Sequence, residues 1–154
     1  MRGLKKLKLT TRGRYAVMAM VELAQKGGKD PVPLIEIAQS GNISLSYLEQ
    51  LFAGLRKHGL VKSYRGPGGG YILARPAAEI RIAEILDSAE DCVPAKRGTK
   101  DPDQDNFGNK QTRILWGHIG EILYISMKHI SLEDVISNRI ESHPAMNKLF
   151  ETLR

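Results

Sequence analysis

The chain has 154 residues, 42% of them hydrophobic and 26% charged, a composition typical of one globular domain or of a small domain with an extension. No apolar run approaches the length that spans a bilayer, and the N-terminal segment lacks the apolar core of a signal peptide. The single cysteine, Cys92, rules out an intramolecular disulfide, and together these features predict a cytoplasmic protein.

The net charge of +6 is divided unevenly along the chain. Residues 1–80 contain 13 Lys and Arg against 5 Asp and Glu, whereas residues 81–154 contain 10 against 12. A basic first half indicates a polyanionic partner, either nucleic acid or an anionic membrane surface. A basic surface that simply faces water has the same composition, so the order of elements must decide between these interpretations.

In the first half, hydrophobic periodicity predicts three helices followed by two β-prone runs. The elements, in chain order, are helices from Thr10 or Thr11 to Lys26, over 34–39 and from Ser44 to Gly59, and strands over 61–65 and 71–75. The third helix could instead be capped by Ser46 with Glu49. The sequence RGPGGG joins the two strands, so it is expected to form the tip of a β-hairpin. Three helices followed by a hairpin are the order of a winged helix-turn-helix.

The second half is expected to be helical around one long loop. A short helix over 80–89 is followed by a segment rich in Asp, Pro, Gly and Asn, and then by a long helix from Thr112 to about Ile130. Two short helices over 132–138 and 145–153 complete the chain. We therefore predict a mainly α protein with a small β-hairpin. Its parts are a winged helix-turn-helix domain over 8–90, a flexible sensor-type loop over 91–111, and a dimerisation helix with a C-terminal tail over 112–154.

Apolar residues repeat at spacings of three and four along the long helix. Because little chain remains to cover this stripe, it predicts a homodimer formed through the helix. The predicted dimerisation residues are Trp116, Ile119, Leu123, Met127 and Ile130.

Polar residues of the third helix lie off its apolar stripe and have the chemistry to read a DNA major groove. Ser and Tyr hydroxyls suit phosphates, Gln50 can pair with adenine, and Glu49 can accept a hydrogen bond from a cytosine amino group. An ordinary exposed polar face is the alternative, and the basic hairpin directly after the helix argues against it. The candidate contacts on and before this helix are Ser44, Ser46, Tyr47, Glu49, Gln50 and Arg56.

The hairpin tip suits a narrow minor groove, because glycines let the backbone approach phosphates closely and Arg65 adds positive charge. A phosphate-binding nucleotide loop is the competing interpretation, but such a loop opens a helix with Gly-Lys-Ser/Thr, whereas a strand follows here. The candidate contacts at the tip are Arg65, Gly66, Pro67 and Gly68, and the candidate phosphate contacts elsewhere are Arg12, Arg14 and Lys62.

Three motifs together carry a resemblance to a known family. TTRGRYAVMAM, ISLSYLEQLFAGLRKHGLV and RGPGGGYILAR resemble the IscR-like iron–sulfur cluster regulators, members of the Rrf-two group of bacterial transcription factors. The similarity covers residues 8–90 closely and the long helix with Trp116 more loosely. It implies a homodimeric winged-helix DNA-binding protein whose long helix crosses that of its partner. It also implies that Ser46, Tyr47, Glu49 and Gln50 face the major groove and residues 65–68 the minor groove.

The sequence departs from that family in the loop before the long helix. Cluster-binding relatives carry three cysteines there, often with a histidine near the helix start, whereas this loop offers only Cys92. Gly98, Lys110 and Arg113 stand about where the other ligands are expected. An iron–sulfur cluster needs about four protein ligands. Two hypotheses stay open: a cluster held by Cys92 with His143 or a histidine of the partner subunit, or a cluster-free regulator that binds constitutively or responds to a small molecule or thiol oxidation.

No nucleophile–base pair or metal set of suggestive spacing is present, so the chain is not expected to be an enzyme. A winged-helix protein-interaction scaffold is a further alternative, but it would not need the basic excess. We therefore predict a sequence-specific regulator, most simply a repressor, of genes for iron–sulfur, iron, sulfur or redox homeostasis. Its expected partners are double-stranded DNA at a pseudo-palindromic operator and a second copy of the chain.

Overall fold

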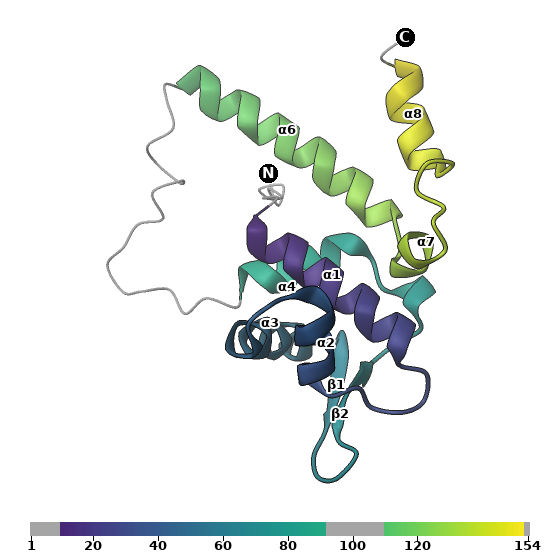
Figure 1. The fold of residues 1–154 in the computed structure, drawn as a ribbon. Coiled ribbons are helices and arrows are strands. Elements are labelled where there is room, and N and C mark those ends of the chain that lie inside the picture. The colour runs from purple at the N-terminus through teal and green to yellow at the C-terminus, as the bar shows by residue number, and fades with distance from the viewer. Residues whose placement is uncertain (1–9, 92–109, 153–154) are drawn as a thin grey trace.

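The computed structural model describes residues 10–91 and 110–152, which are mostly helical with one two-stranded antiparallel hairpin (Figure 1). The elements are α1 (Thr11–Lys26), α2 (Leu34–Gly41), α3 (Leu45–Lys57), β1 (Val61–Tyr64), β2 (Gly70–Leu73), the 3-10 turn η1 (Ala77–Glu79), α4 (Ile82–Glu90), α6 (Lys110–His129), α7 (Leu132–Ile136) and α8 (Pro144–Thr152). Three helices followed by a hairpin confirm the predicted fold class. Within these described ranges, no helix is long and apolar enough to cross a membrane.

Side-chain caps set where the first and third helices begin. Thr10 caps α1, because its Oγ1 accepts a hydrogen bond from the Gly13 N–H at 3.2 Å. Ser44 caps α3 in the same way, accepting from the Tyr47 N–H at 3.3 Å, so the alternative cap at Ser46 is not used. Such a cap satisfies a backbone donor that has no partner within the helix.

One hydrophobic core joins α1, α2, α3 and α4. Its largest fully buried side chains include Phe52, Met20, Leu23 and Ile37, which come from three of these helices. Each helix contributes because its apolar residues recur on one face, and full burial of a side chain of this size contributes about 1.5–3 kcal/mol.

The hairpin is attached to this core at its base. β1 and β2 pair antiparallel from Val61 opposite Leu73 to Tyr64 opposite Gly70. The segment before α2 adds a bridge to β2, in which the Val32 and Tyr71 N–H groups each donate to the other residue's carbonyl at 2.9 Å. The Tyr71 ring also meets Phe52 edge-on, with ring centroids 4.7 Å apart. The hairpin therefore has a fixed direction relative to α3.

The end of α6 is tied to the start of α4. The Ile82 N–H donates to the Ile130 carbonyl at 3.0 Å, and the Leu132 N–H donates to the Ile80 carbonyl at 2.8 Å. Ile130 and Leu132 are buried in the same core as the winged helix, so the core extends beyond residue 90. From this anchor, α6 runs away from the rest of the fold toward its own N-terminal end (Figure 1).

Candidate nucleic-acid interface

The third helix separates an apolar face from a polar one. Leu48, Leu51, Phe52 and Leu55 are buried, which directs the opposite face outward. The polar residues on that outward face are Ser46, Glu49, Gln50 and Arg56, all exposed, and Ser44 is exposed at the cap. The arrangement gives hydroxyl, carboxylate, amide and guanidinium groups on one exposed surface, which is the chemistry that base edges and phosphates require.

Tyr47 is held differently from its neighbours on α3. It is only half-exposed, and its ring packs edge-on against Tyr15 of α1, with centroids 5.8 Å apart and planes at 85°. Edge-to-face contact is a favoured geometry for aromatic pairs. The contact restricts the directions that the Tyr47 side chain can take, and the periodicity of the sequence contained no signal of this pairing.

The backbone conformation of the wing tip itself requires glycine, in addition to any need for the exposed tip to approach DNA closely. Gly66 and Gly68 have φ values of +96° and +72°, a region that residues with a Cβ adopt at a cost. Gly69 donates to the Gly66 carbonyl at 2.9 Å, and a Cβ on Gly69 would lie 2.5 Å from the Tyr64 carbonyl oxygen. Arg65 is exposed beside this turn. The tight turn thus requires glycine whether or not DNA is bound, a reason that the sequence argument did not include.

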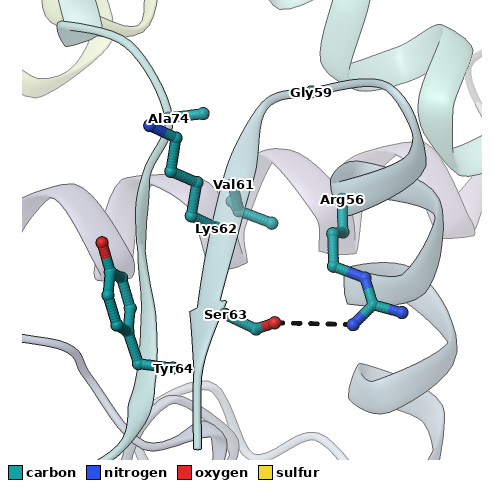
Figure 2. Close-up of a pocket in the computed structure, with 7 residues that line it drawn as sticks. All are labelled: Arg56, Gly59, Val61, Lys62, Ser63, Tyr64 and Ala74. Atoms are coloured by element: carbon teal, nitrogen blue, oxygen red, sulfur yellow. Dashed lines mark hydrogen bonds between the residues drawn. The ribbon is translucent and has the colours of Figure 1, made fainter.

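A basic groove lies between the end of α3 and β1. It has a volume of about 670 Å³ and is lined by Arg56, Gly59, Val61, Lys62, Ser63, Tyr64 and Ala74 (Figure 2). The Arg56 Nη1 donates to the Ser63 Oγ at 3.4 Å. Two of the predicted DNA contacts, Arg56 and Lys62, therefore line the same groove. The other two predicted phosphate contacts, Arg12 and Arg14, lie on the first turn of α1, where Arg14 is exposed and Arg12 half-buried.

Two contacts connect α1 and the end of α3 to the C-terminal end of α4. His58, at the end of α3, lies 2.7 Å from Asp91, measured from Nε2 to Oδ2. Thr10, which caps α1, donates from Oγ1 to Glu90 Oε1 at 2.7 Å. Glu90 is the last residue of α4 and Asp91 follows it, so both contacts lie at the end of the first described range.

The predicted dimerisation stripe is divided between two environments. Trp116 is 59% exposed and Ile119 is 38% exposed, whereas Ile130 is buried and Leu123 and Met127 pack partly against the core of this chain. The apolar surface that α6 leaves exposed therefore overlaps the predicted stripe at Trp116 and Ile119 but not at Leu123, Met127 or Ile130. The residues of this outer α6 face are Ile114, Leu115, Trp116, Ile119, Ile122 and Ile125.

The candidate cluster ligands do not form a ligand set in the described part of the chain. Cys92 lies outside the described residues. His143 has both ring nitrogens engaged, because Nδ1 accepts from the Ala145 N–H at 3.2 Å and Nε2 lies 3.6 Å from Asp134 Oδ2. Among residues 10–91 and 110–152, no three His, Cys, Asp or Glu side chains gather closely enough to hold a metal ion. To bind iron through Nδ1, His143 would have to give up the hydrogen bond from Ala145, and to bind iron through Nε2 it would have to give up the contact with Asp134.

Comparisons with known proteins agree with this geometry. Residues 9–138 match the Rrf2 family, described as iron-dependent transcriptional regulators. The HTH-type transcriptional regulator IscR of Cereibacter sphaeroides is 41% identical over 152 residues, which cover 96% of this chain and 98% of the relative. The solved structure of T. potens IscR has a TM-score of 0.65 and 37% identity, covering 89% of this chain and 91% of its own.

A second solved structure is similar to the same extent. CymR (YrzC), described as the global cysteine regulator of B. subtilis, has a TM-score of 0.65 and 37% identity, covering 86% of this chain and 98% of its own. The family match includes all of the winged helix, its wing and α6. The chain therefore belongs to the Rrf2 family, the Rrf-two group indicated by its motifs, and is a DNA-binding transcriptional regulator.

Proposed function

We propose that this regulator binds a pseudo-palindromic operator as a homodimer and represses genes of iron–sulfur, iron, sulfur or redox homeostasis. The observation that carries the proposal is the joint exposure of the polar face of α3 and the glycine-tipped wing, which the Val32–Tyr71 bridge holds in a fixed relation. The choice of target genes is supported by the description of the family as iron-dependent and of CymR as a cysteine regulator.

We assign sequence discrimination to α3 and general affinity to the basic residues. Glu49 and Gln50 lie one turn or more into the helix on its exposed face, where they can reach base edges in a major groove. Arg14 and Lys62 are exposed cations suited to phosphates, which add affinity for any sequence. Arg65 at the wing suits a narrow minor groove, whose negative potential attracts arginine.

Selection of a high-affinity duplex from a random library, followed by titrations on that duplex and on random DNA, tests this assignment. Gln50→Ala should lose about 1–3 kcal/mol of discrimination between the two. Lys62→Ala should weaken both equally and reduce the salt slope by about one unit. Gln25→Ala, an exposed glutamine in the last turn of α1, is the matched control. Equal losses on both duplexes for Gln50→Ala would show that α3 presents a different face to the bases.

The outer α6 face supports dimerisation with a second copy of the chain. Leu115, Ile119 and Ile122 recur at spacings of four and three, as in helices that pair along an apolar seam. A second copy offers an identical face, and twofold symmetry makes such a contact self-complementary. A twofold dimer in turn requires operator half-sites about one helical turn, roughly 34 Å, apart or a multiple of that distance.

Sedimentation of the free protein tests the dimer. Ile122→Lys places a charge in the proposed seam and should convert the dimer to a monomer that keeps its helical content. Ile35→Lys is the matched control, because Ile35 of α2 is 48% exposed and Ile122 is 51% exposed. A wild-type monomer at micromolar concentration, or a dimer that survives Ile122→Lys, would contradict the proposal.

The residues of this chain do not fit an iron–sulfur cluster bound by thiolates alone, since 154 residues contain one cysteine and a cluster needs about four protein ligands. Operator binding is accordingly proposed without a cluster-dependent step. The cluster hypothesis that remains is a site formed by Cys92 with His143 or a histidine of the partner subunit. In the structure His143 contacts Asp134 and Ala145. Anaerobic absorption spectra with iron and sulfide analysis of wild type and Cys92→Ala test whether a cluster is bound. Visible absorption and stoichiometric iron in wild type, both lost in the variant, would establish the cluster.

Repression is tested by comparing transcripts with and without the regulator under iron limitation and iron sufficiency. Transcripts whose promoters contain the selected site should rise when the regulator is deleted. A fall in those transcripts would identify an activator instead. If the site-bearing promoters belong to genes outside iron, sulfur and redox metabolism, the proposed targets are wrong while the DNA-binding function stands.

A further inference from the structure

We propose that the basic groove between α3 and the wing is a binding site for one backbone phosphate, with Arg56 as its main ligand and Ser63 as the residue that positions Arg56. The proposal rests on the proposed mode of DNA binding. The phosphate is the one in the DNA strand that separates the major groove entered by α3 from the minor groove reached by the wing. Neither Ser63 nor this groove followed from the sequence motifs.

The position of the groove determines which part of the DNA can occupy it. The two grooves of a duplex are separated by a sugar–phosphate strand, and the major groove admits a helix while the minor groove is only about 6 Å wide. A protein with α3 in one groove and its wing at the next must let that strand pass between them. In this molecule Arg56 and Ser63 line the space between those two elements, which forms part of the groove of about 670 Å³.

The side chains at the groove are arranged for an anion. Arg56 and Ser63 point toward one another across it, whereas Lys62 and Tyr64 extend from the other side of β1 (Figure 2). Side chains alternate between the faces of a strand, which explains this division. A guanidinium has five N–H donors, of which the 3.4 Å bond to Ser63 uses one, and its planar fork matches two phosphate oxygens. The Ser63 hydroxyl can itself donate to the same phosphate.

Backbone contacts fix the distance between the helix end and the strand. The Gly59 N–H donates to the Arg56 carbonyl at 3.0 Å, and the Leu60 N–H donates to the Leu55 carbonyl at 3.0 Å. Gly59 makes this turn with φ +69°, and Leu60 and Val61 are buried directly after it. The groove is therefore formed before DNA arrives, so little ordering is needed when a phosphate binds.

Side chains must supply the donors at this site. The carboxyl end of a helix presents carbonyl oxygens and a partial negative charge, which repel an anion rather than bind it. The site consequently depends on Arg56 more strongly than a phosphate site at a helix N-terminus would depend on any one side chain. We expect Arg56→Ala to lower affinity about tenfold or more, the loss typical of a charge-assisted hydrogen bond.

Neutral methylphosphonate substitutions, introduced one at a time into the selected duplex, test the proposal. The affinity of wild type should fall about tenfold when the substituted phosphate is the one between the contacted major and minor grooves. Arg56→Ala should bind the unmodified duplex more weakly, and substitution of that phosphate should not weaken its binding further. Lys62→Ala should still lose affinity when that phosphate is substituted. Ser63→Ala should reduce the sensitivity, and Ser63→Thr, which keeps the hydroxyl, should restore it. Circular dichroism confirms that each variant is folded.

The outcomes separate this proposal from the proposed function. If Arg56→Ala remains as sensitive as wild type at every phosphate, the groove does not bind one. If the sensitivity lost in Arg56→Ala lies at a phosphate outside the strand between the two contacted grooves, the assigned geometry is wrong. If Ser63→Ala keeps full sensitivity, Ser63 does not position Arg56. Failure of wild type to prefer any selected duplex would instead reject the proposed sequence-specific binding, and the phosphate site with it.

Discussion

Replacement of Gly70 by alanine should detach the base of the wing from the helix-turn-helix. Gly70 begins β2, and a Cβ at this position would clash with the carbonyl carbon and oxygen of Val32 and lie 2.7 Å from the nitrogen of Pro33. These are backbone atoms of the segment that leads into α2, so they cannot move aside as a flexible side chain would. The clash should therefore separate β2 from that segment rather than be absorbed locally.

The cost of this separation can be worked from the contacts that it breaks. The bridge between Val32 and Tyr71 consists of two backbone hydrogen bonds of 2.9 Å, each contributing about 0.5–1.5 kcal/mol. The edge-on contact of Tyr71 with Phe52 contributes about 0.5–1.5 kcal/mol more. The free energy of unfolding should thus fall by about 1.5–4.5 kcal/mol.

Urea unfolding of Gly70→Ala, compared with that of Gly68→Ala, measures this loss in the free energy of unfolding. Gly68 has φ +72°, and a Cβ added there would have nothing within 4 Å, so its substitution adds only the backbone strain of about 1–2 kcal/mol. Affinity for the selected duplex should fall further for Gly70→Ala, because the wing loses its direction relative to α3. Equal destabilisation by the two substitutions would refute the reasoning, since it would show that the contact with Val32 carries no free energy.

Two further predictions concern the ends of helices. Thr10→Ala removes both the cap of α1 and the hydrogen bond to Glu90, so it should lower the free energy of unfolding by about 1–2 kcal/mol, whereas the exposed Thr11→Ala should have little effect. Hydrogen bonds from the Ser131 side chain and backbone hold the pKa of Asp134 below its ordinary value of 3.8. Because the folded-state pKa is depressed, this stabilisation is fully present above the unfolded-state pKa and is lost as pH falls through the folded-state pKa. Urea midpoints measured from about pH 6 to about pH 3 should therefore fall less steeply for Asp134→Asn than for wild type, and parallel curves would contradict the assignment.

Much of the fold could be predicted because it depends on local rules. Three helices, a cap at Thr10 or Thr11, a cap at Ser44 or Ser46 and a hairpin around the glycine-rich turn follow from periodicity, capping and turn preferences, which act within a few neighbouring residues. The hydrogen bonds of the folded chain then select Thr10 and Ser44. The exposed face of α3 followed in the same way, since the apolar stripe of a helix determines which residues point outward. The family could be recognised because several such motifs occur together in a characteristic order.

The sequence alone determined the order of elements, the polar face of α3 and the shortage of thiolate ligands, since each of these depends on residue type and local spacing. Tertiary structure decided which neighbour covers each apolar residue. Spacing placed Trp116 and Ile130 on one stripe, yet the pairing of the α6 end with α4 buries Ile130 in this chain and leaves Trp116 exposed. The contacts of Arg56 with Ser63 and of His58 with Asp91 likewise could be seen only in the tertiary structure. Their side chains are 7 and 33 residues apart in sequence and meet only because the chain folds back on itself.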